Sequence, residues 1–260
     1  MTTTVQLHQR LEQISVRFST LEHAVALIGL GSIGLEHQRF DQYSDLDFFA
    51  VVERGYKSRT LSDLSWLTEC SAVAYQFFNT KEGCKLMFAD EVFCEFAVFE
   101  EHELADISFS PGRLVWSKEN ASSTLAFPIK RPRKDEAPDT QWLIGEALTN
   151  LYVGMQRELR GEHLSAMRFI QCYALDRVVE LYSLTHGSNS IDIDDFDISR
   201  RLEQRFPELL AALGSMLQGY HGNAASTLSI LKLLETMQPV NVAMATIIRR
   251  QCALGINDTE

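Results

Sequence analysis

The sequence predicts an α+β protein, with a mixed or antiparallel sheet and flanking helices in the N-terminal half and a helical bundle in the C-terminal half. In the first half, apolar runs of strand length follow one another with short gaps, whereas parallel neighbours need a crossover of a dozen or more residues. After a charged segment with three prolines, at residues 127–139, apolar residues recur with helical spacing in long runs. We therefore predict two domains, residues 1–135 and 136–260.

The elements of the first half are predicted from their apolar patterns. A helical stripe covers residues 4–19, and a second helix is expected near residues 61–69. Short runs rich in β-branched and aromatic residues predict strands. These runs are residues 25–30, 48–52, 72–78, 85–88 and 92–99, with a possible edge strand at 112–117.

The second half is predicted to be helical throughout. Long amphipathic runs cover residues 142–160 and 162–185, and the stretches 199–219 and 224–252 also have a helical pattern of apolar residues. Together they predict a bundle of about four or five helices.

The segment from residue 25 to residue 53 carries two competing nucleotide-binding patterns. Gly29, Gly31 and Gly34 spell the glycine pattern of a dinucleotide site, with Glu53 about 20 residues on. That site needs an amphipathic helix after the third glycine, and residues 35–45 are too polar and too short to form one. The context therefore disfavours a dinucleotide site.

The second pattern would bind a nucleoside triphosphate with a divalent metal. Asp45 and Asp47 open an apolar strand and point to the same side of it, because side chains alternate along a strand. Two carboxylates on one face suit Mg²⁺. Gly31 lets the backbone approach a phosphate closely, and Ser32 adds a hydroxyl and an N–H group. The other interpretation is a surface turn with a structural glycine and serine.

A third acid strengthens the metal hypothesis. Glu95 is flanked by apolar residues throughout the predicted strand 92–99. An isolated carboxylate there is costly unless it is paired or bound to a metal. If this strand lies beside residues 48–52, Glu95 completes a site of three carboxylates. If instead the strand is at an edge, Glu95 faces water.

The order Gly31-Ser32, then Asp45-x-Asp47, then an acid on a later strand resembles the nucleotidyltransferase superfamily of the polymerase-beta kind. Residues 41–46, 94–96 and 160–162 are similar to antibiotic nucleotidyltransferases, first to the lincosamide group and then to the aminoglycoside group. The loop between Ser32 and Asp45 departs from that pattern, because it is longer and lacks the second glycine.

The resemblance implies a nucleotidyltransferase fold for residues 1–135 and an acceptor-binding role for residues 136–260. The implied reaction is Mg²⁺-dependent transfer of a nucleoside monophosphate, AMP from ATP, to a hydroxyl of a small molecule. A lincosamide or aminoglycoside acceptor would make the protein an antibiotic-resistance enzyme.

The resemblance also implies roles for single residues. Asp45 and Asp47 would hold Mg²⁺, and Glu95 would act as general base with a share in metal binding. Gly31 and Ser32 would hold the triphosphate.

Arg168, on a predicted helix of the second half, is a further candidate for a phosphate contact. The alternative for it is a surface arginine paired with a neighbouring glutamate.

Two other classes of function stay open at this point. The same fold can serve as an antitoxin-like or inactive binding module that acts on a protein partner, although the large helical half favours a small-molecule pocket. A nicotinamide-dependent enzyme would bind its cofactor without Mg²⁺ and would tolerate loss of Asp47.

Charge and cysteine content limit the partners. The net charge of −11 argues against a nucleic-acid substrate, and the basic cluster at residues 130–134 is followed at once by two acids. An acidic protein suits a small cationic acceptor.

Five widely spaced cysteines with no C-x-x-C pair indicate reduced thiols and a cytoplasmic location. The absence of an 18-residue apolar run predicts no membrane span. The patterns do not specify the acceptor, the nucleotide or the oligomeric state.

Overall fold

The structure is a computed structural model that describes residues 2–130, 139–186, 194 and 197–257. The chain forms two compact units, Met1–Arg133 and Lys134–Glu260. The predicted domain boundary between residues 135 and 136 lies outside the described residues, as does most of the basic cluster at 130–134.

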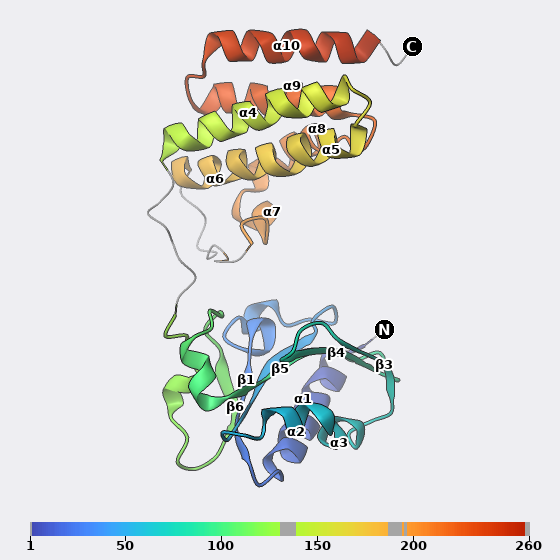
Figure 1. The fold of residues 1–260 in the computed structure, drawn as a ribbon, viewed down its shortest axis with the longest axis vertical. Coiled ribbons are helices and arrows are strands. Elements are labelled where there is room, and N and C mark those ends of the chain that lie inside the picture. Colours follow the sequence, from blue (N-terminus) through green and yellow to red (C-terminus); the bar gives the residue numbers. More distant parts are fainter. Residues whose placement is uncertain (1, 131–138, 187–193, 195–196, 258–260) are drawn as a thin grey trace. The chain divides into compact units, whose positions relative to one another are not determined.

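The first unit contains a six-stranded mixed sheet, which confirms the predicted fold class (Figure 1). The strand order is β3-β4-β5-β2-β1-β6. Strands β2 and β5 run parallel, and every other neighbouring pair is antiparallel. The strands are β1 (Ala24–Gly29), β2 (Leu46–Val52), β3 (Val73–Phe78), β4 (Gly83–Phe88), β5 (Phe93–Glu100) and β6 (Arg113–Ser117).

Three helices lie on one face of this sheet (Figure 1). They are α1 (Thr4–Ser19), α2 (Lys57–Ser62) and α3 (Ser65–Thr68). The aromatic rings of Phe18, Trp66 and Phe96 pack edge-on between the helices and the strands. This packing buries the main apolar core of the unit.

The prediction of a single helix near residues 61–69 is wrong. Asp63 has extended backbone angles, and its carboxylate accepts a hydrogen bond from the N–H of Ser65 at 3.0 Å. Such a local side-chain bond competes with helical hydrogen bonding. It therefore separates α2 from α3.

The opposite face of the sheet is covered over part of its area. Two 3₁₀ turns, η3 (Glu101–Ala105) and η4 (Ser123–Ala126), bring Leu104 and Ala126 onto it, together with Phe109 from the segment between them. This second cluster lies over the later residues of β2, such as Val51. The first residues of β2 and β5 do not belong to it.

The second unit is helical, as predicted. It has its own buried core. Its elements are α4 (Thr140–Glu158), α5 (His163–Met167), a π-helical segment η5 (Arg168–Ala174), α6 (Leu175–Thr185), α7 (Leu202–Arg205), a 3₁₀ turn η6 (Pro207–Leu209), α8 (Leu210–Met216), α9 (Asn223–Met237) and α10 (Val242–Asn257).

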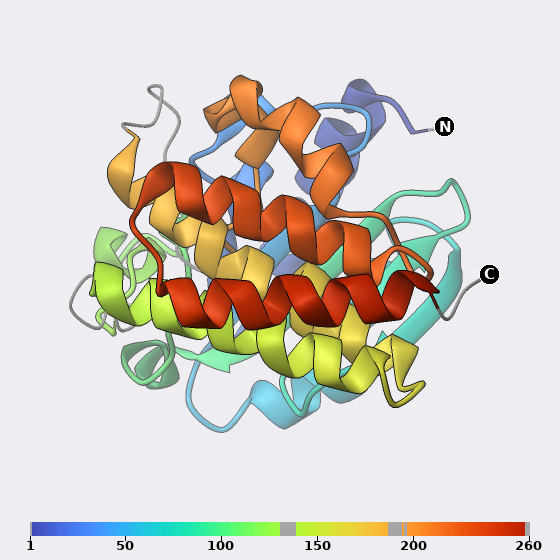
Figure 2. The ribbon, with the colours of Figure 1, turned by 90° about the horizontal axis from the view of Figure 1, so that it is seen from above.

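The helices α4, α9 and α10 lie side by side (Figures 1 and 2). The predicted run 224–252 is two helices, α9 and α10, because Pro239 falls between them and cannot donate a helical hydrogen bond. The predicted run 162–185 is continuous through η5. None of the helices in the described part of the chain is long and apolar enough to cross a membrane.

Candidate active site

The structure places Asp47 and Glu95 side by side. Strands β2 and β5 are parallel neighbours, and Asp47 pairs with Glu95 in their register. Paired residues point to the same face of a sheet, which here is the face away from the helices. Both side chains are half-buried. Asp45 is exposed and lies one residue before β2 begins.

The Gly31-Ser32 turn reaches the same end of the sheet. Strand β1 is antiparallel to β2, so its last residues lie beside the first residues of β2. The N–H of Leu30 donates to the carbonyl oxygen of Asp47 at 2.8 Å. Gly31 has a φ of +51°, in the left-handed region that favours glycine. The sequence therefore places a glycine where the chain must turn beside Asp47.

An arginine from β6 holds this turn in place. The Nε of Arg113 donates to the carbonyl oxygen of Ile33 at 2.7 Å. Burial lowers the pKa of the Arg113 guanidinium below its usual range. Because an arginine stays protonated at neutral pH even so, this bond fixes the turn η1 (Gly31–Ile33) next to the carboxylates.

Glu95 has partners on the side away from Asp47. The Nζ of Lys85 lies 3.1 Å from Oε2 of Glu95, and the Nδ2 of Asn79 lies 3.5 Å from Oε1. Lys85 also pairs with Glu95 in the register of β4 and β5. Strand β5 is an inner strand of the sheet, so the edge-strand alternative for Glu95 is wrong.

The carboxylates have the right chemistry for Mg²⁺, because this ion takes hard oxygen ligands. In the described part of the chain, however, no three or more His, Cys, Asp or Glu side chains are gathered closely enough to hold a metal ion. A cation, the ammonium of Lys85, already lies against Glu95. The metal site of Asp45, Asp47 and Glu95 therefore stays a prediction.

Arg39 is a candidate that the sequence analysis missed. Its Nη2 lies 3.7 Å from where a Cβ at Gly31 would be, and its Nε donates to Glu36 at 2.6 Å. A guanidinium beside a glycine turn is a ready contact for phosphate. The polar loop 35–45 offers no periodic pattern that would identify Arg39 from the sequence.

Arg168, the predicted phosphate contact of the second half, is the first residue of η5 and is exposed. Within the described residues it has no ion-pair partner, so the alternative of a surface pair with a neighbouring glutamate is not seen. It belongs to the second unit, whereas all the other candidates lie in the first.

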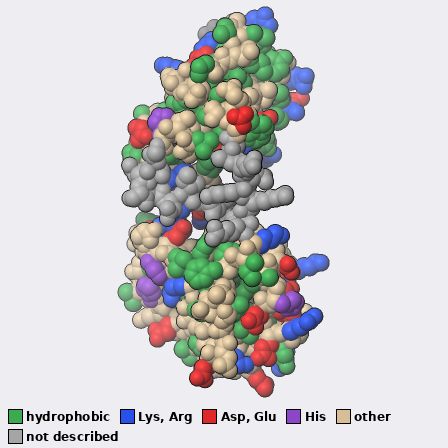
Figure 3. Space-filling model, turned by 90° about the vertical axis from the view of Figure 1, so that its left-hand side faces the viewer, with side chains coloured by type: hydrophobic (Ala, Val, Ile, Leu, Met, Phe, Trp, Pro, Cys, Tyr) green, Lys and Arg blue, Asp and Glu red, His purple; other side chains and the backbone are tan. Residues whose placement is uncertain are grey.

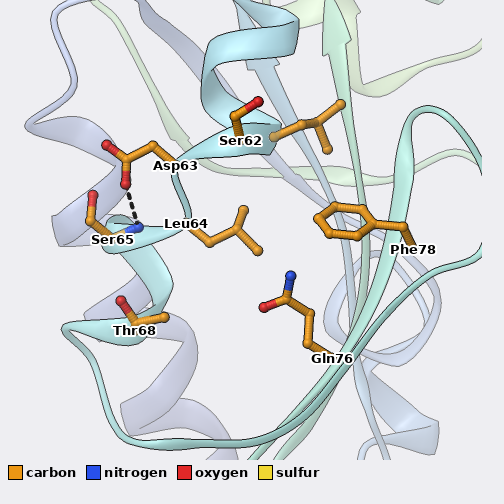
Figure 4. A pocket seen from close by; sticks show the side chains of 8 residues that line it. Ser62, Asp63, Leu64, Ser65, Thr68, Gln76 and Phe78 are labelled. Atoms are coloured by element: carbon orange, nitrogen blue, oxygen red, sulfur yellow. Dashed lines mark hydrogen bonds between the residues drawn. The ribbon is translucent and has the colours of Figure 1, made fainter.

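An open hollow of about 560 Å³ lies at the edge of the sheet, on the helix-covered face. Gln76 and Phe78 of β3 face Leu64 across it (Figure 4). In the sheet register Gln76 aligns with Leu86, a residue of the core beneath the helices. The hollow is thus on the other side of the sheet from Asp47 and Glu95.

Comparison with known proteins gives weak structural likenesses. No family model and no curated protein matches the chain. An aminoglycoside 6-adenyltransferase from Bacillus subtilis aligns with 96% of this chain and 96% of its own, at 12% identity and a TM-score of 0.36. A nucleotidyltransferase-like protein from Exiguobacterium sibiricum aligns with 97% of this chain over 80% of its own length, at 10% identity and a TM-score of 0.33.

A third structure, a STING-associated CdnE c-di-GMP synthase from Capnocytophaga granulosa, covers 98% of this chain and 81% of its own, at 9% identity and a TM-score of 0.34. At these values the likenesses carry no functional argument. The residues of the site carry it instead.

Proposed function

We propose that the protein is a Mg²⁺-dependent nucleotidyltransferase that moves a nucleoside monophosphate, AMP from ATP, onto a hydroxyl of a small molecule. The observation that supports this most is the pairing of Asp47 with Glu95 on parallel neighbouring strands, beside the turn at Gly31 and Ser32. At one end of a sheet, two carboxylates can bind a metal ion and a glycine turn can bind the phosphates of a triphosphate.

In this proposal Asp45 and Asp47 hold Mg²⁺, with Glu95 taking a share. When bound, the ion neutralises charge on the phosphates and on the leaving group. Gly31 has no side chain to obstruct a phosphate oxygen, and Ser32 offers its hydroxyl and backbone N–H.

Arg39 is proposed as a further phosphate contact beside Gly31. The guanidinium is fixed by Glu36 and faces the turn. Its planar group of donors matches the geometry of phosphate oxygens.

Glu95 is the proposed general base. Its carboxylate takes the proton of the acceptor hydroxyl as that oxygen forms a bond to the α-phosphorus. The bond from the α-phosphorus to the bridging oxygen breaks, and pyrophosphate leaves with the electron pair. A positioned base of this kind contributes about 10²–10⁴-fold to the rate.

The helical unit is proposed to bind the acceptor, with Arg168 as a phosphate contact. A lincosamide or aminoglycoside is the acceptor that the sequence resemblance favours. The net charge of −11 suits a cationic molecule and disfavours nucleic acid. The five cysteines are free thiols, which fits a cytoplasmic location.

The first experiment measures pyrophosphate release from ATP with Mg²⁺, against a panel of lincosamides and aminoglycosides. We expect release that depends on one class of acceptor. Asp47→Asn and Glu95→Gln keep the side-chain shapes and should abolish it. Glu119→Gln changes an exposed acid of the same unit and is the matched control.

Other outcomes would change the proposal. ATP binding that depends on Mg²⁺, without turnover on any acceptor, would point to the binding-module alternative. If ATP does not bind at all, the roles of Gly31, Ser32, Asp45 and Asp47 are wrong.

A further inference from the structure

Four side chains form a row across the open face of the sheet. Phe77, Lys85, Glu95 and Asp47 pair in register from β3 through β4 and β5 to β2. All four therefore point to the same face. A lysine that no functional pattern in the sequence singles out thus lies one strand away from the proposed base.

The ion pair of Lys85 with Glu95 is not one that the fold requires. Their side chains are 37% and 40% exposed. Pairs with this much contact to water contribute little to stability, because water screens them and both side chains lose freedom. A lysine ammonium on a flexible stem is also free to move to another oxygen nearby.

Lys85 and a divalent cation would compete for the same carboxylate. A metal bound through Oε2 of Glu95 must displace the ammonium of Lys85 or share that oxygen with it. At either oxygen, two cations so close repel each other. Asn79 lies near the other oxygen of Glu95 and can keep the carboxylate oriented when Lys85 leaves.

Two other basic side chains near the Gly31-Ser32 turn already have hydrogen-bond partners. Arg39 pairs with Glu36, and Arg113 donates to a backbone carbonyl. Lys85 differs from them because its partner is itself a proposed metal ligand. Binding of a metal would therefore free the ammonium of Lys85 beside the two carboxylates.

We propose that Lys85 is the resident counter-cation of the metal-free site, and that metal binding transfers its ammonium from Glu95 to the phosphates of the nucleotide. This inference rests on the proposed function. Lys85 then has two successive roles. It neutralises Glu95 before the metal binds, and it contacts the nucleotide afterwards.

The proposal makes two predictions of opposite sign, which a purely structural cross-strand pair would not produce. Removing the ammonium should strengthen the binding of the metal alone, because its competitor is gone. The same change should weaken the binding of metal-bound nucleotide, because a phosphate contact is lost.

The test compares the wild-type protein with Lys85→Met, Lys85→Arg and Lys81→Met. Lys81 is an exposed lysine in the turn before β4 and is the matched control. Mn²⁺ affinity is measured from the electron paramagnetic resonance signal of the free ion, and Mn·ATP affinity by calorimetry. Circular dichroism checks that each variant is folded.

We expect Lys85→Met to bind Mn²⁺ about three- to tenfold more tightly and Mn·ATP about tenfold more weakly. Lys85→Arg and Lys81→Met should stay close to wild type in both assays. If Lys85→Met matches the wild type in either assay while the wild type binds both ligands, this inference is overturned and the proposed function stands. A wild-type protein that binds neither ligand overturns both.

Discussion

Glu95 illustrates at the scale of one residue how a carboxylate is kept in an apolar strand. Its neighbours Cys94 and Phe96 are buried in the core beneath the helices. Because side chains alternate along a strand, Glu95 points to the other, half-open face. There Lys85 balances its charge at 3.1 Å. The cost of burying a carboxylate is avoided, and its oxygens stay open to solvent.

The positive φ of Gly31 gives a testable prediction at the same scale. Gly31→Ala meets no atom closer than 3.7 Å, so its cost is the backbone strain of a left-handed alanine, about 1 kcal/mol. We expect the melting temperature to fall by about 2–4 °C. Under the proposed function ATP should also bind more weakly, because the new methyl group would stand where a phosphate is proposed to approach.

Gly55→Ala is the control for this effect. Gly55 has a φ of +89° with open space around it, and it lies after β2, away from the carboxylates. Its substitution should lower the melting temperature and leave ATP binding intact. Equal ATP binding by the two alanine variants would show that no phosphate approaches Gly31.

At the scale of elements, one histidine joins β1 to α2. His23 is buried, stacks on Tyr56 with ring centroids 4.6 Å apart, and shares a hydrogen bond of 2.9 Å with Thr60 through Nε2. Burial, followed by the nearby charge of Arg59, lowers the pKa of His23 below its usual value. This environment therefore favours the neutral imidazole.

This lowered pKa predicts how stability depends on pH. The unfolded chain takes up a proton on His23 near pH 6.5, about the unperturbed pKa, whereas the folded protein does so only at lower pH. Stability from this contact is thus complete above about pH 6.5 and is lost as the pH falls below it. Urea midpoints at pH 7.5 and pH 5.5 measure the loss.

His23→Gln should show a smaller difference between the two midpoints than the wild type, whatever its absolute stability. His37→Gln, which changes an exposed histidine, should keep the wild-type difference. An unchanged difference in His23→Gln would mean that other groups account for the pH dependence.

Elements were easier to predict from the sequence than their partners. Strands β1, β2 and β5 lie within two residues of their predicted positions, because alternation and apolar runs are local signals. The break at Asp63 was missed, since one side-chain hydrogen bond decides it. The pairing of Lys85 with Glu95 depends on strand order and register, which no local pattern carries.

At the scale of the whole molecule, the apolar residues form separate cores in the two units. One unit buries Leu27 beneath its sheet, and the other buries Leu231 between its helices, each completely. No described residue is common to both cores. This separation predicts that the two units unfold in distinct calorimetric transitions.

Leu27→Ala and Leu231→Ala test this separation. Each removes a fully buried side chain and should cost about 2–5 kcal/mol. We expect Leu27→Ala to lower one transition temperature and Leu231→Ala to lower the other. A single transition that both substitutions lower equally would show that the two units unfold as one.

The distribution of charge is also a property of the whole molecule. On the side of each unit that Figure 3 draws, acidic and basic side chains are interspersed among the described residues. The excess of acids over the complete sequence gives −11. An excess of acids opposes binding to a nucleic-acid backbone, and it fits the proposed small-molecule acceptor.

The π-helical segment Arg168–Ala174 has a consequence for how the helical unit can change in length. Deleting one residue there would let α5 and α6 join as an ordinary α-helix. A π-helical turn takes up one more residue than an α-helical turn, so the residues on both sides of it keep their faces when one residue is removed. Ala166 would therefore stay on the buried side of α5. A gap of one residue at this point would preserve the inner and outer faces of α5, whereas the same gap in the middle of an ordinary α-helix would turn them by about 100°.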